Sequence, residues 1–286
     1  MQIANYEYTE QIGQGGFGTI YKGRNVKTGE KVVVKTEPQN VEFSSLKHES
    51  NILNLLYSKS CRNISPIYWY GVVANPSKRI LVMPFYDESL EQFARTRKMT
   101  KTHMSNIIRS AIFILEHIHT KYVVHRDIKP ANFMIHNDEL ILIDFGLASF
   151  YVDSNERHLS PANPKKMHII GTPKYVSWNV HCGEEYSRRD DLMSLVYVGL
   201  YLIYGGELWT SPPIVSFLEK DDDKSLIMHP LNQWFKTQKD LANIRSMTGS
   251  EWGELEQFAK NVYSLSFQER PSYKDYTRLF LSRTPA

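Results

Sequence analysis

Residues 125–146 read His-Arg-Asp-Ile-Lys-Pro-Ala-Asn-Phe-Met-Ile-His-Asn-Asp-Glu-Leu-Ile-Leu-Ile-Asp-Phe-Gly, and the interpretation of the whole chain depends on them. They follow residues 101–120, where apolar residues recur at helical spacing and predict an amphipathic helix. Asp127 is a candidate base that orients a hydroxyl nucleophile, and Lys129 can neutralise a phosphoryl group in transfer. Asn132 can give an oxygen ligand to Mg²⁺, an ion that prefers hard oxygen donors. A purely structural loop would rarely combine these residues.

A second carboxylate closes this stretch at Asp144, in the tripeptide Asp-Phe-Gly. Two short apolar runs precede it, at residues 132–135 and 140–143, and with the polar turn between them they predict a small hairpin. The tripeptide is common on its own, but its order and spacing after Asn132 favour one shared mechanism. Asp144 would then bridge Mg²⁺ to the β- and γ-phosphates of a nucleotide.

Glycines near the N-terminus form a Gly-x-Gly-x-x-Gly pattern at Gly13, Gly15 and Gly18. Glycine lets a backbone approach phosphates closely, but it also forms ordinary turns, and the pattern alone does not distinguish the two. A dinucleotide-binding loop would open a helix within a βαβ unit. Here β-like runs follow instead, at residues 19–23 and 31–36. The context therefore favours a hairpin folded over a nucleotide.

Lys35 ends the apolar run Val32-Val33-Val34 and could either project into solvent or hold nucleotide phosphates. The second role needs a carboxylate that fixes the ammonium group. A helical pattern follows at residues 42–57, and Glu49 is its best-placed carboxylate. Alone, Glu49 would more often be a solvated helix charge, so the pair with Lys35 rests on the surrounding motifs.

The length of 286 residues corresponds to about two domains or lobes, at roughly 150 residues each. A composition of 42% hydrophobic and 23% charged residues excludes disordered, collagenous and coiled-coil classes. Five β-like runs occur before residue 86, and helical patterns dominate afterwards. We predict an α+β, bilobal fold. Its small lobe, residues 1–85, holds five strands and one helix, and its large lobe, residues 86–286, is mainly helical.

The charge balance is mild, because 34 Lys and Arg residues against 31 Asp and Glu residues give a net charge of +3. This value gives no support for a nucleic-acid or membrane partner. The longest nearly apolar run, residues 192–204, is too short to cross a bilayer and predicts a buried helix. No secretory signal is visible at the N-terminus. The two cysteines, Cys61 and Cys182, favour a reducing compartment, so we expect an intracellular protein, cytoplasmic or nuclear.

Taken together, these motifs resemble those of eukaryotic-type protein kinases along nearly the whole chain. Residues 171–179, Gly-Thr-Pro-Lys-Tyr-Val-Ser-Trp-Asn, and residues 186–192, Tyr-Ser-Arg-Arg-Asp-Asp-Leu, resemble the casein kinase 1 family in particular. That family carries Ser-x-Asn where most kinases have Ala-Pro-Glu, and residues 177–179 fit this pattern. Within the large lobe, Asp191 resembles the aspartate that anchors the catalytic loop, and Arg270 resembles a structural arginine.

The resemblance implies an ATP site as well as catalytic and Mg²⁺-binding residues. Met83 would be the gatekeeper, while the carbonyl of Pro84 and the N–H and carbonyl of Tyr86 would meet the adenine edge. Proline can occupy such a position only if its carbonyl alone is used, because it has no N–H. The implied nucleotide-binding residues are Ile12, Gly13, Gly15, Gly18, Ile20, Val33, Lys35, Glu49, Met83, Pro84 and Tyr86. The implied catalytic residues are Lys35, Asp127 and Lys129, and the implied Mg²⁺ ligands are Asn132 and Asp144.

The implied activity is transfer of the γ-phosphoryl group of ATP to protein Ser/Thr hydroxyls, since Lys129 and Thr172 match Ser/Thr kinases. We expect a monomer that is active without phosphorylation of residues 147–170. Family members prefer acidic or pre-phosphorylated substrates, and Lys174 with Lys165 and Lys166 fits such recognition. The chain lacks the basic residue that the family often has just after residues 208–213.

Two alternatives remain from other classes of function. A pseudokinase scaffold would bind partners without phosphoryl transfer, but none of its usual degenerate positions is degenerate here, including Lys35, Asp127 and Asp144. A small-molecule phosphotransferase on a related fold would not need the peptide-binding segment at residues 171–179. Incubation with ATP, Mg²⁺ and a protein substrate distinguishes the three.

Overall fold

The computed structural model describes residues 1–15, 18–58, 61–74, 77–161, 169–209 and 224–281. The chain divides into two compact units. The first comprises Met1–Ser89 with Phe133–Ala148, and the second comprises Leu90–Asn132 with Ser149–Ala286. The sequence analysis divided the chain differently, into lobes at residues 1–85 and 86–286, and that division stays a prediction. The acidic run at residues 221–223 lies outside the described residues.

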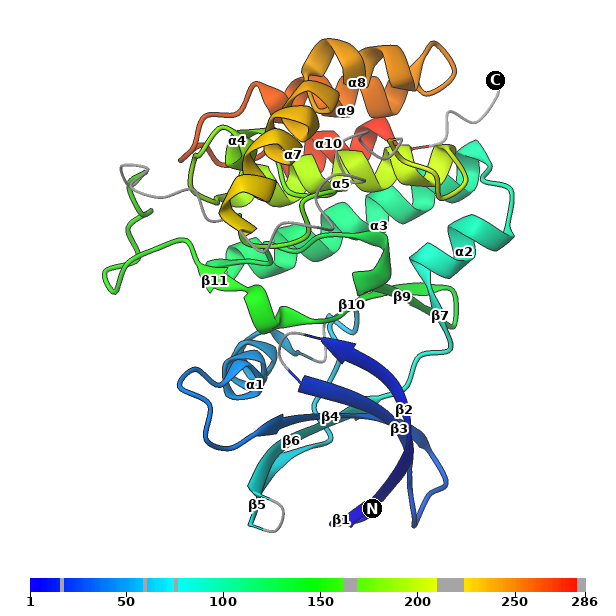
Figure 1. The fold of residues 1–286 in the computed structure, drawn as a ribbon. Coiled ribbons are helices and arrows are strands. Elements are labelled where there is room, and N and C mark those ends of the chain that lie inside the picture. Colours follow the sequence, from blue (N-terminus) through cyan, green and yellow to red (C-terminus); the bar gives the residue numbers. More distant parts are fainter. Residues whose placement is uncertain (16–17, 59–60, 75–76, 162–168, 210–223, 282–286) are drawn as a thin grey trace. The chain divides into compact units, whose positions relative to one another are not determined.

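An antiparallel sheet of six strands forms the greater part of the first unit (Figure 1), in the order β1-β2-β3-β4-β6-β5. The strands are β1 (Gln2–Ile3), β2 (Tyr6–Gly15), β3 (Gly18–Asn25), β4 (Lys31–Pro38), β5 (Trp69–Ala74) and β6 (Ser77–Pro84). Five strands were predicted, and the sixth is the two-residue edge strand β1, which is too short to show any alternation. Val32 and Val34 of β4 are buried in the core on one face. The two-residue period of a strand therefore puts Val33 and Lys35 on the other face.

Helix α1 (Ser45–Leu56) begins after Ser44, whose hydroxyl accepts a hydrogen bond from the backbone N–H of Lys47. Its buried face includes Leu46, Glu49 and Leu53, so the carboxylate lies among apolar neighbours. The predicted hairpin is confirmed as β9 (Phe133–His136) and β10 (Glu139–Leu142), and β9 also pairs with β7 (Glu88–Ser89). A short 3₁₀ helix, η2 (Phe145–Leu147), follows Asp144.

Helices dominate the second unit, which confirms the α+β class. They are α2 (Leu90–Thr96), α3 (Lys101–Thr120), α4 (Trp178–His181), α5 (Arg188–Ile203), α7 (Lys224–Gln238), α8 (Leu241–Thr248), α9 (Gly253–Tyr263) and α10 (Tyr273–Leu279). The described part of the unit also contains a 3₁₀ helix, η1 (Pro130–Asn132), and a two-stranded ladder of β8 (Val123–Val124) and β11 (Ser149–Phe150). Helix α5 contacts both α3 and α9 (Figure 1) and is buried along almost its entire length.

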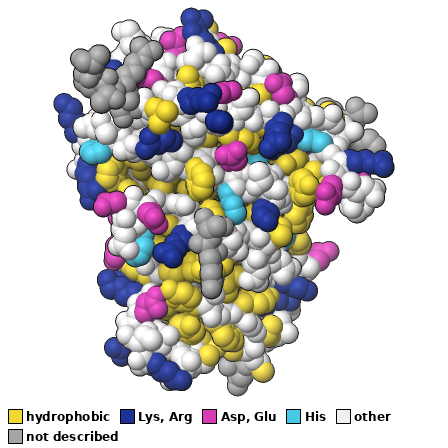
Figure 2. Space-filling view, turned by 180° about the vertical axis from the view of Figure 1, so that it is seen from behind, with side chains coloured by type: hydrophobic (Ala, Val, Ile, Leu, Met, Phe, Trp, Pro, Cys, Tyr) yellow, Lys and Arg dark blue, Asp and Glu magenta, His cyan; other side chains and the backbone are white. Residues whose placement is uncertain are grey.

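The apolar run at residues 192–204 lies in and just after α5, as predicted. Among the described residues, no helix combines the length and the apolar character that a bilayer span requires. Cys61 and Cys182 are both free thiols. On the face drawn in Figure 2, Lys and Arg side chains are interspersed with Asp and Glu rather than gathered in one block, in keeping with the mild net charge.

Candidate active site

Three charged side chains meet in the first unit. Lys35 projects from β4, Glu49 from α1, and Asp144 from the residue that precedes η2. The Nζ atom of Lys35 donates to both carboxylate oxygens of Glu49, at 2.7 and 3.0 Å, and to Oδ1 of Asp144 at 3.1 Å. The predicted pair of Lys35 and Glu49 is therefore present, and the structure adds Asp144 to it.

This cluster is strongly desolvated at one end, because the Glu49 side chain is only 2% exposed whereas that of Asp144 is 42% exposed. Burial alone would lower the pKa of Lys35, but the carboxylates of Asp144 and Glu49 outweigh burial and raise this pKa above its usual value. Lys35 is therefore a fixed ammonium group at neutral pH. Such a group can hold anionic oxygens beside it without reorganisation.

The backbone at Gly18, the last glycine of the loop, leaves no room for a side chain. Its φ is +140°, which side chains rarely adopt, and a Cβ atom there would overlap the backbone carbonyl of Thr36. Gly13 pairs with Ile20 and Gly15 with Gly18, so the loop is the tip of the β2–β3 hairpin as the sequence predicts. A small cavity of about 70 Å³ lies beside it within the first unit. Its lining residues are Gly18, Thr19, Ile20, Lys35, Thr36, Ser45, Leu46, Glu49, Asp144 and Gly146.

The residues predicted for the adenine ring belong to the same sheet or follow it. Ile20 pairs with Lys35 across β3 and β4, and Val33 pairs with Met83 across β4 and β6. Met83 is buried, which suits a residue at the back of a pocket.

Around these residues, Pro84 pairs with Val32 at the end of β6, and Ile12 is exposed at 44%. Tyr86 donates through its hydroxyl to Ser65, and burial raises its pKa. Their contacts with adenine stay a prediction.

A second cluster surrounds Asp127 in the second unit. Oδ1 of Asp127 accepts hydrogen bonds from the backbone N–H and the hydroxyl of Thr172, at 3.0 and 2.7 Å. Oδ2 accepts from Nζ of Lys129 at 2.7 Å and from Nδ2 of Asn132 at 3.1 Å. Lys129 also donates to the hydroxyl of Thr172 at 3.0 Å. Four donors thus hold one carboxylate in a single orientation, as a group that positions a nucleophile requires.

Asn132 is oriented so that it can serve as a cation ligand. Its Nδ2 group donates to the backbone carbonyl of Asp127 at 2.8 Å and to the Asp127 carboxylate, which leaves the carboxamide oxygen as the atom available to a metal. Among the described residues no group of three or more His, Cys, Asp or Glu side chains could hold a metal by itself. The Asn132 carboxamide and the Asp144 carboxylate are each oxygen donors of the kind that Mg²⁺ prefers, and their role as its ligands stays a prediction.

The loop that carries Asp127 is fixed from below by Asp191, as the sequence predicts. Asp191 accepts hydrogen bonds from the backbone N–H groups of His125 and Arg126, at 2.8 and 3.0 Å. Nε2 of the buried His119 lies 2.9 Å from the same carboxylate. Burial tends to raise the pKa of Asp191, but these hydrogen bonds and the nearby histidines outweigh it and lower the pKa. The role of His119 was not foreseen from the sequence.

The Ser-x-Asn segment is held by the neighbouring aspartate, Asp190. The hydroxyl of Ser177 and the amide of Asn179 both donate to Oδ1 of Asp190, and Ser177 also caps α4 by accepting from the N–H of Val180. Arg270, which resembles a structural arginine of the large lobe, is exposed and lines a cavity of about 220 Å³. Lys239, which the sequence analysis missed, is a buried cation whose Nζ atom donates to the carbonyl of Val176, directly before the segment.

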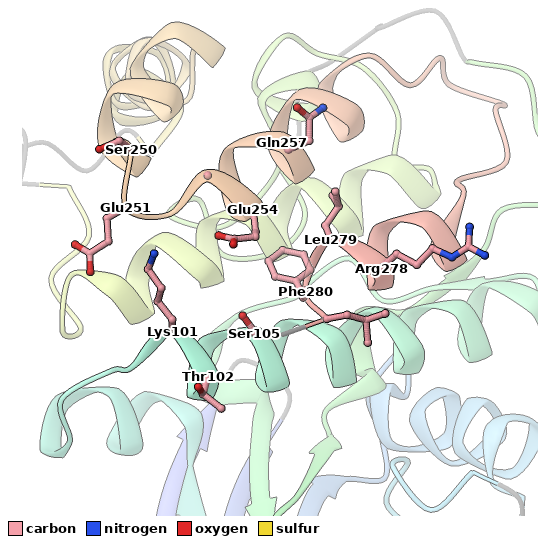
Figure 3. Close-up of a pocket in the computed structure, with 12 residues that line it drawn as sticks. Lys101, Thr102, Ser105, Ser250, Glu251, Glu254, Gln257, Arg278, Leu279 and Phe280 are labelled. Atoms are coloured by element: carbon pink, nitrogen blue, oxygen red, sulfur yellow. The ribbon is translucent and has the colours of Figure 1, made fainter. Parts of the chain in front are cut away.

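A larger cavity of about 820 Å³ lies elsewhere in the second unit. Figure 3 shows it between the start of α3, the residues before α9 and the end of α10, with Lys101, Glu251 and Glu254 among its lining side chains. It contains none of the residues predicted for nucleotide binding or catalysis. The Lys35 cluster of the first unit and the Asp127 cluster of the second therefore remain the two candidate sites.

A comparison with models of protein families matches the description "protein kinase domain" over residues 6–279. The match spans both clusters, from the glycine loop to the helices that support Asp127. The N-terminal antiparallel sheet and the mainly helical second part agree with the α+β fold of that domain. The matched range covers most of the chain, and the chain therefore belongs to the protein kinase family.

Proposed function

We propose that this kinase is a Ser/Thr protein kinase of casein kinase 1 type. The observation that supports it most is the contact of Lys129 with both Asp127 and Thr172, at 2.7 and 3.0 Å. The resemblance to Ser/Thr kinases at positions 129 and 172 thus corresponds to a real three-residue arrangement around the candidate base. The Ser-x-Asn segment at residues 177–179 adds support for the branch.

In the proposed reaction, the hydroxyl oxygen of a Ser/Thr substrate forms a bond to the γ-phosphorus, and the bond from that phosphorus to its bridging oxygen breaks. Asp127 orients the hydroxyl and takes its proton, while Lys129 stabilises charge on the transferring group. Lys35 holds the α- and β-phosphates. Asn132 and Asp144 would hold Mg²⁺, which supplies charge neutralisation on the phosphates.

We propose constitutive activity, without a phosphorylated activation segment. In its support, the Lys35 contact with Glu49 and the Asp127 contact with Thr172 involve no residue of the segment 147–170. Phosphatase-treated protein from bacteria should keep its full rate. A large loss of rate after that treatment would contradict the proposal.

Recognition of acidic or pre-phosphorylated substrates is proposed on the basis of Lys174. Its ammonium lies 5.5 Å from the centre of the Tyr201 ring, and burial lowers its pKa. Lys165 and Lys166, the other basic residues predicted to contribute, lie outside the described residues. A peptide panel with and without acidic or phosphorylated residues before the target tests this preference, and equal rates would contradict it.

The decisive experiment is incubation with labelled ATP, Mg²⁺ and casein, followed by acid hydrolysis and identification of the labelled amino acid. We expect labelled phosphoserine or phosphothreonine, and a loss of at least about 100-fold in Asp127→Asn and Lys35→Met. Lys260→Met, at an exposed ion pair on α9, is the matched control and should keep full activity. Nucleotide binding without transfer would indicate a pseudokinase, and labelled phosphotyrosine would contradict the Ser/Thr assignment.

A further inference from the structure

Lys239 is a fully buried lysine in the second unit, directly after α7. Its backbone is fixed at both ends, because its N–H donates to the carbonyl of Phe235 at 2.9 Å and its carbonyl accepts from the hydroxyl of Tyr263 at 2.7 Å. Tyr263 belongs to α9 and also contacts the hydroxyl of Tyr197 on α5. The side chain therefore starts from a rigid point in the helical core.

Three acceptors surround the ammonium group. Nζ of Lys239 donates to the carbonyls of Pro173 and Val176, at 2.8 and 2.6 Å, and lies 2.9 Å from Nε2 of His181. Asn232 donates through its Nδ2 to the carbonyl of His181, so its Oδ1 faces Nδ1 of His181. Nδ1 then carries the proton, and Nε2, which also lies 3.2 Å from the carbonyl of Pro173, can accept from Lys239. Three acceptors match the three N–H bonds of an ammonium group.

Three aromatic rings lie close to the ammonium group of Lys239. Nζ lies 4.9 Å from the ring centre of Tyr197, 5.0 Å from that of Phe235 and 5.2 Å from that of Trp209. The faces of these rings attract a cation. Burial lowers the pKa of Lys239 well below its usual value. A lysine in such surroundings is a costly feature, which argues for a specific use.

The two carbonyls that Lys239 holds belong to the turn next to the candidate base. Pro173 directly follows Thr172, whose hydroxyl and N–H both contact Asp127. The carbonyl of Thr172 in turn accepts from the N–H groups of Tyr175 and Val176, at 2.7 and 3.0 Å. Residues 172–176 thus form one compact turn, with Asp127 bound to its first residue and Lys239 bound to its second and last.

We propose that Lys239 is a positioning residue that holds the turn at residues 172–176, and through Thr172 the orientation of Asp127, for phosphoryl transfer to a peptide. The catalytic part of this inference rests on the proposed function. The anchoring part does not, because it concerns only contacts within the second unit. Lys239 holds the turn through the carbonyls of Pro173 and Val176, so its effect on Asp127 is exerted through the backbone of the turn.

The test compares Lys239→Met with the wild type. Methionine keeps the length and the packing against aromatic rings but removes the charge and all three donors. Lys260→Met is the matched control, because it removes an exposed lysine of α9 from the same unit. Hydrogen exchange measured by mass spectrometry should show the amides of Tyr175 and Val176 exchanging about 10-fold faster or more in Lys239→Met, with α9 unchanged.

If exchange rises in α5 and α9 as much as at residues 172–176, Lys239 has a general structural role and the proposal is overturned. Unchanged exchange at residues 172–176 would also overturn it. If Lys239→Met does not fold, Lys239→Gln, which keeps two N–H donors, is measured by the same criteria. This readout needs no turnover. It therefore separates a failure of the anchoring inference from a failure of the proposed function.

Steady-state kinetics then test the catalytic part with a Ser/Thr peptide. We expect kcat/KM for the peptide to fall about 10- to 100-fold, with KM for ATP within about twofold of the wild-type value. A general loss of folded enzyme would lower kcat alone and would leave both KM values unchanged. Equal kinetics in Lys239→Met and the wild type would overturn the proposed link to Asp127.

Discussion

Thr172 donates twice to a single oxygen of Asp127, through its hydroxyl at 2.7 Å and through its backbone N–H at 3.0 Å. The side-chain bond can be removed while the backbone bond is kept. This makes Thr172 a sensitive probe of how far catalysis depends on the orientation of the candidate base.

Replacement of Thr172 by valine removes the hydroxyl and preserves the shape of the side chain. We expect kcat to fall about 10- to 100-fold, because Asp127 and Lys129 both lose a hydrogen-bond partner. Thr172→Ser keeps the hydroxyl and should stay within a few-fold of the wild type. Steady-state peptide phosphorylation measures both variants, and equal losses in the two would show that the hydroxyl has no such role.

Lys35→Met should destabilise the protein by about 2–4 kcal/mol, because the Glu49 carboxylate is then left buried without its cation. The double variant Lys35→Met/Glu49→Gln should recover much of this loss, since a neutral amide replaces the uncompensated charge. Neither variant should phosphorylate substrates. Urea unfolding measures the free energies, and additive losses in the double variant would contradict the coupling.

Stability should fall in acid partly through His181. Burial and the nearby Lys239 charge lower the pKa of His181 to about 4, from an ordinary value of 6.5. The unfolded chain therefore binds a proton below about pH 6.5 while the folded chain does not, so the contribution of His181 is lost as pH falls from 6.5 towards 4. The loss should approach about 1.4 kcal/mol per pH unit within this window.

His181→Gln removes this titration, and its free energy of unfolding should decline less steeply between pH 6.5 and 4.5 than that of the wild type. Urea unfolding at several pH values measures both slopes. Parallel curves for the two proteins would show that the pKa of His181 is not lowered in the folded state.

Gly18→Ala should raise KM for ATP and lower the melting temperature, because its Cβ would overlap the carbonyl of Thr36 and its φ is +140°. Gly253→Ala is the matched comparison, since a Cβ there meets nothing within 4 Å at the start of α9. That variant should be neutral or more stable by up to about 1 kcal/mol. Thermal unfolding and ATP kinetics measure both, and equal effects would contradict the steric argument.

Local sequence order predicted much of the site. The motifs at residues 125–132 and 144–146 carry their chemistry in consecutive residues, and the helix at residues 101–120 was predicted with the bounds of α3. The pair of Lys35 and Glu49 was foreseen only as part of this set, because a lysine in a strand and a glutamate in a helix are individually unremarkable. The Ser/Thr and casein kinase 1 assignments, the monomeric state and the intracellular location stay predictions.

The roles of His119 and Lys239 were missed because tertiary packing buries both side chains. Lys239 follows the last turn of α7, where a lysine is ordinarily solvated. The neighbouring sequence does not indicate that Pro173, Val176 and three aromatic rings surround it. Arg270 is the opposite case. Its position in the sequence resembles that of a structural arginine, and the structure leaves its side chain exposed.

The hairpin of β9 and β10 has a practical consequence for dissecting the enzyme. It clusters with Met1–Ser89 although Leu90–Asn132 separates them along the chain, and it is joined there through Asn63, whose carbonyl accepts from the N–H of Leu142 and whose amide donates to the carbonyl of Leu140. A fragment cut at Ser89 would omit Asp144 and leave Lys35 with half of its ionic partners. The shortest continuous polypeptide that contains the whole first unit runs from Met1 to Ala148, so this unit cannot be cloned without the loop that bears Asp127.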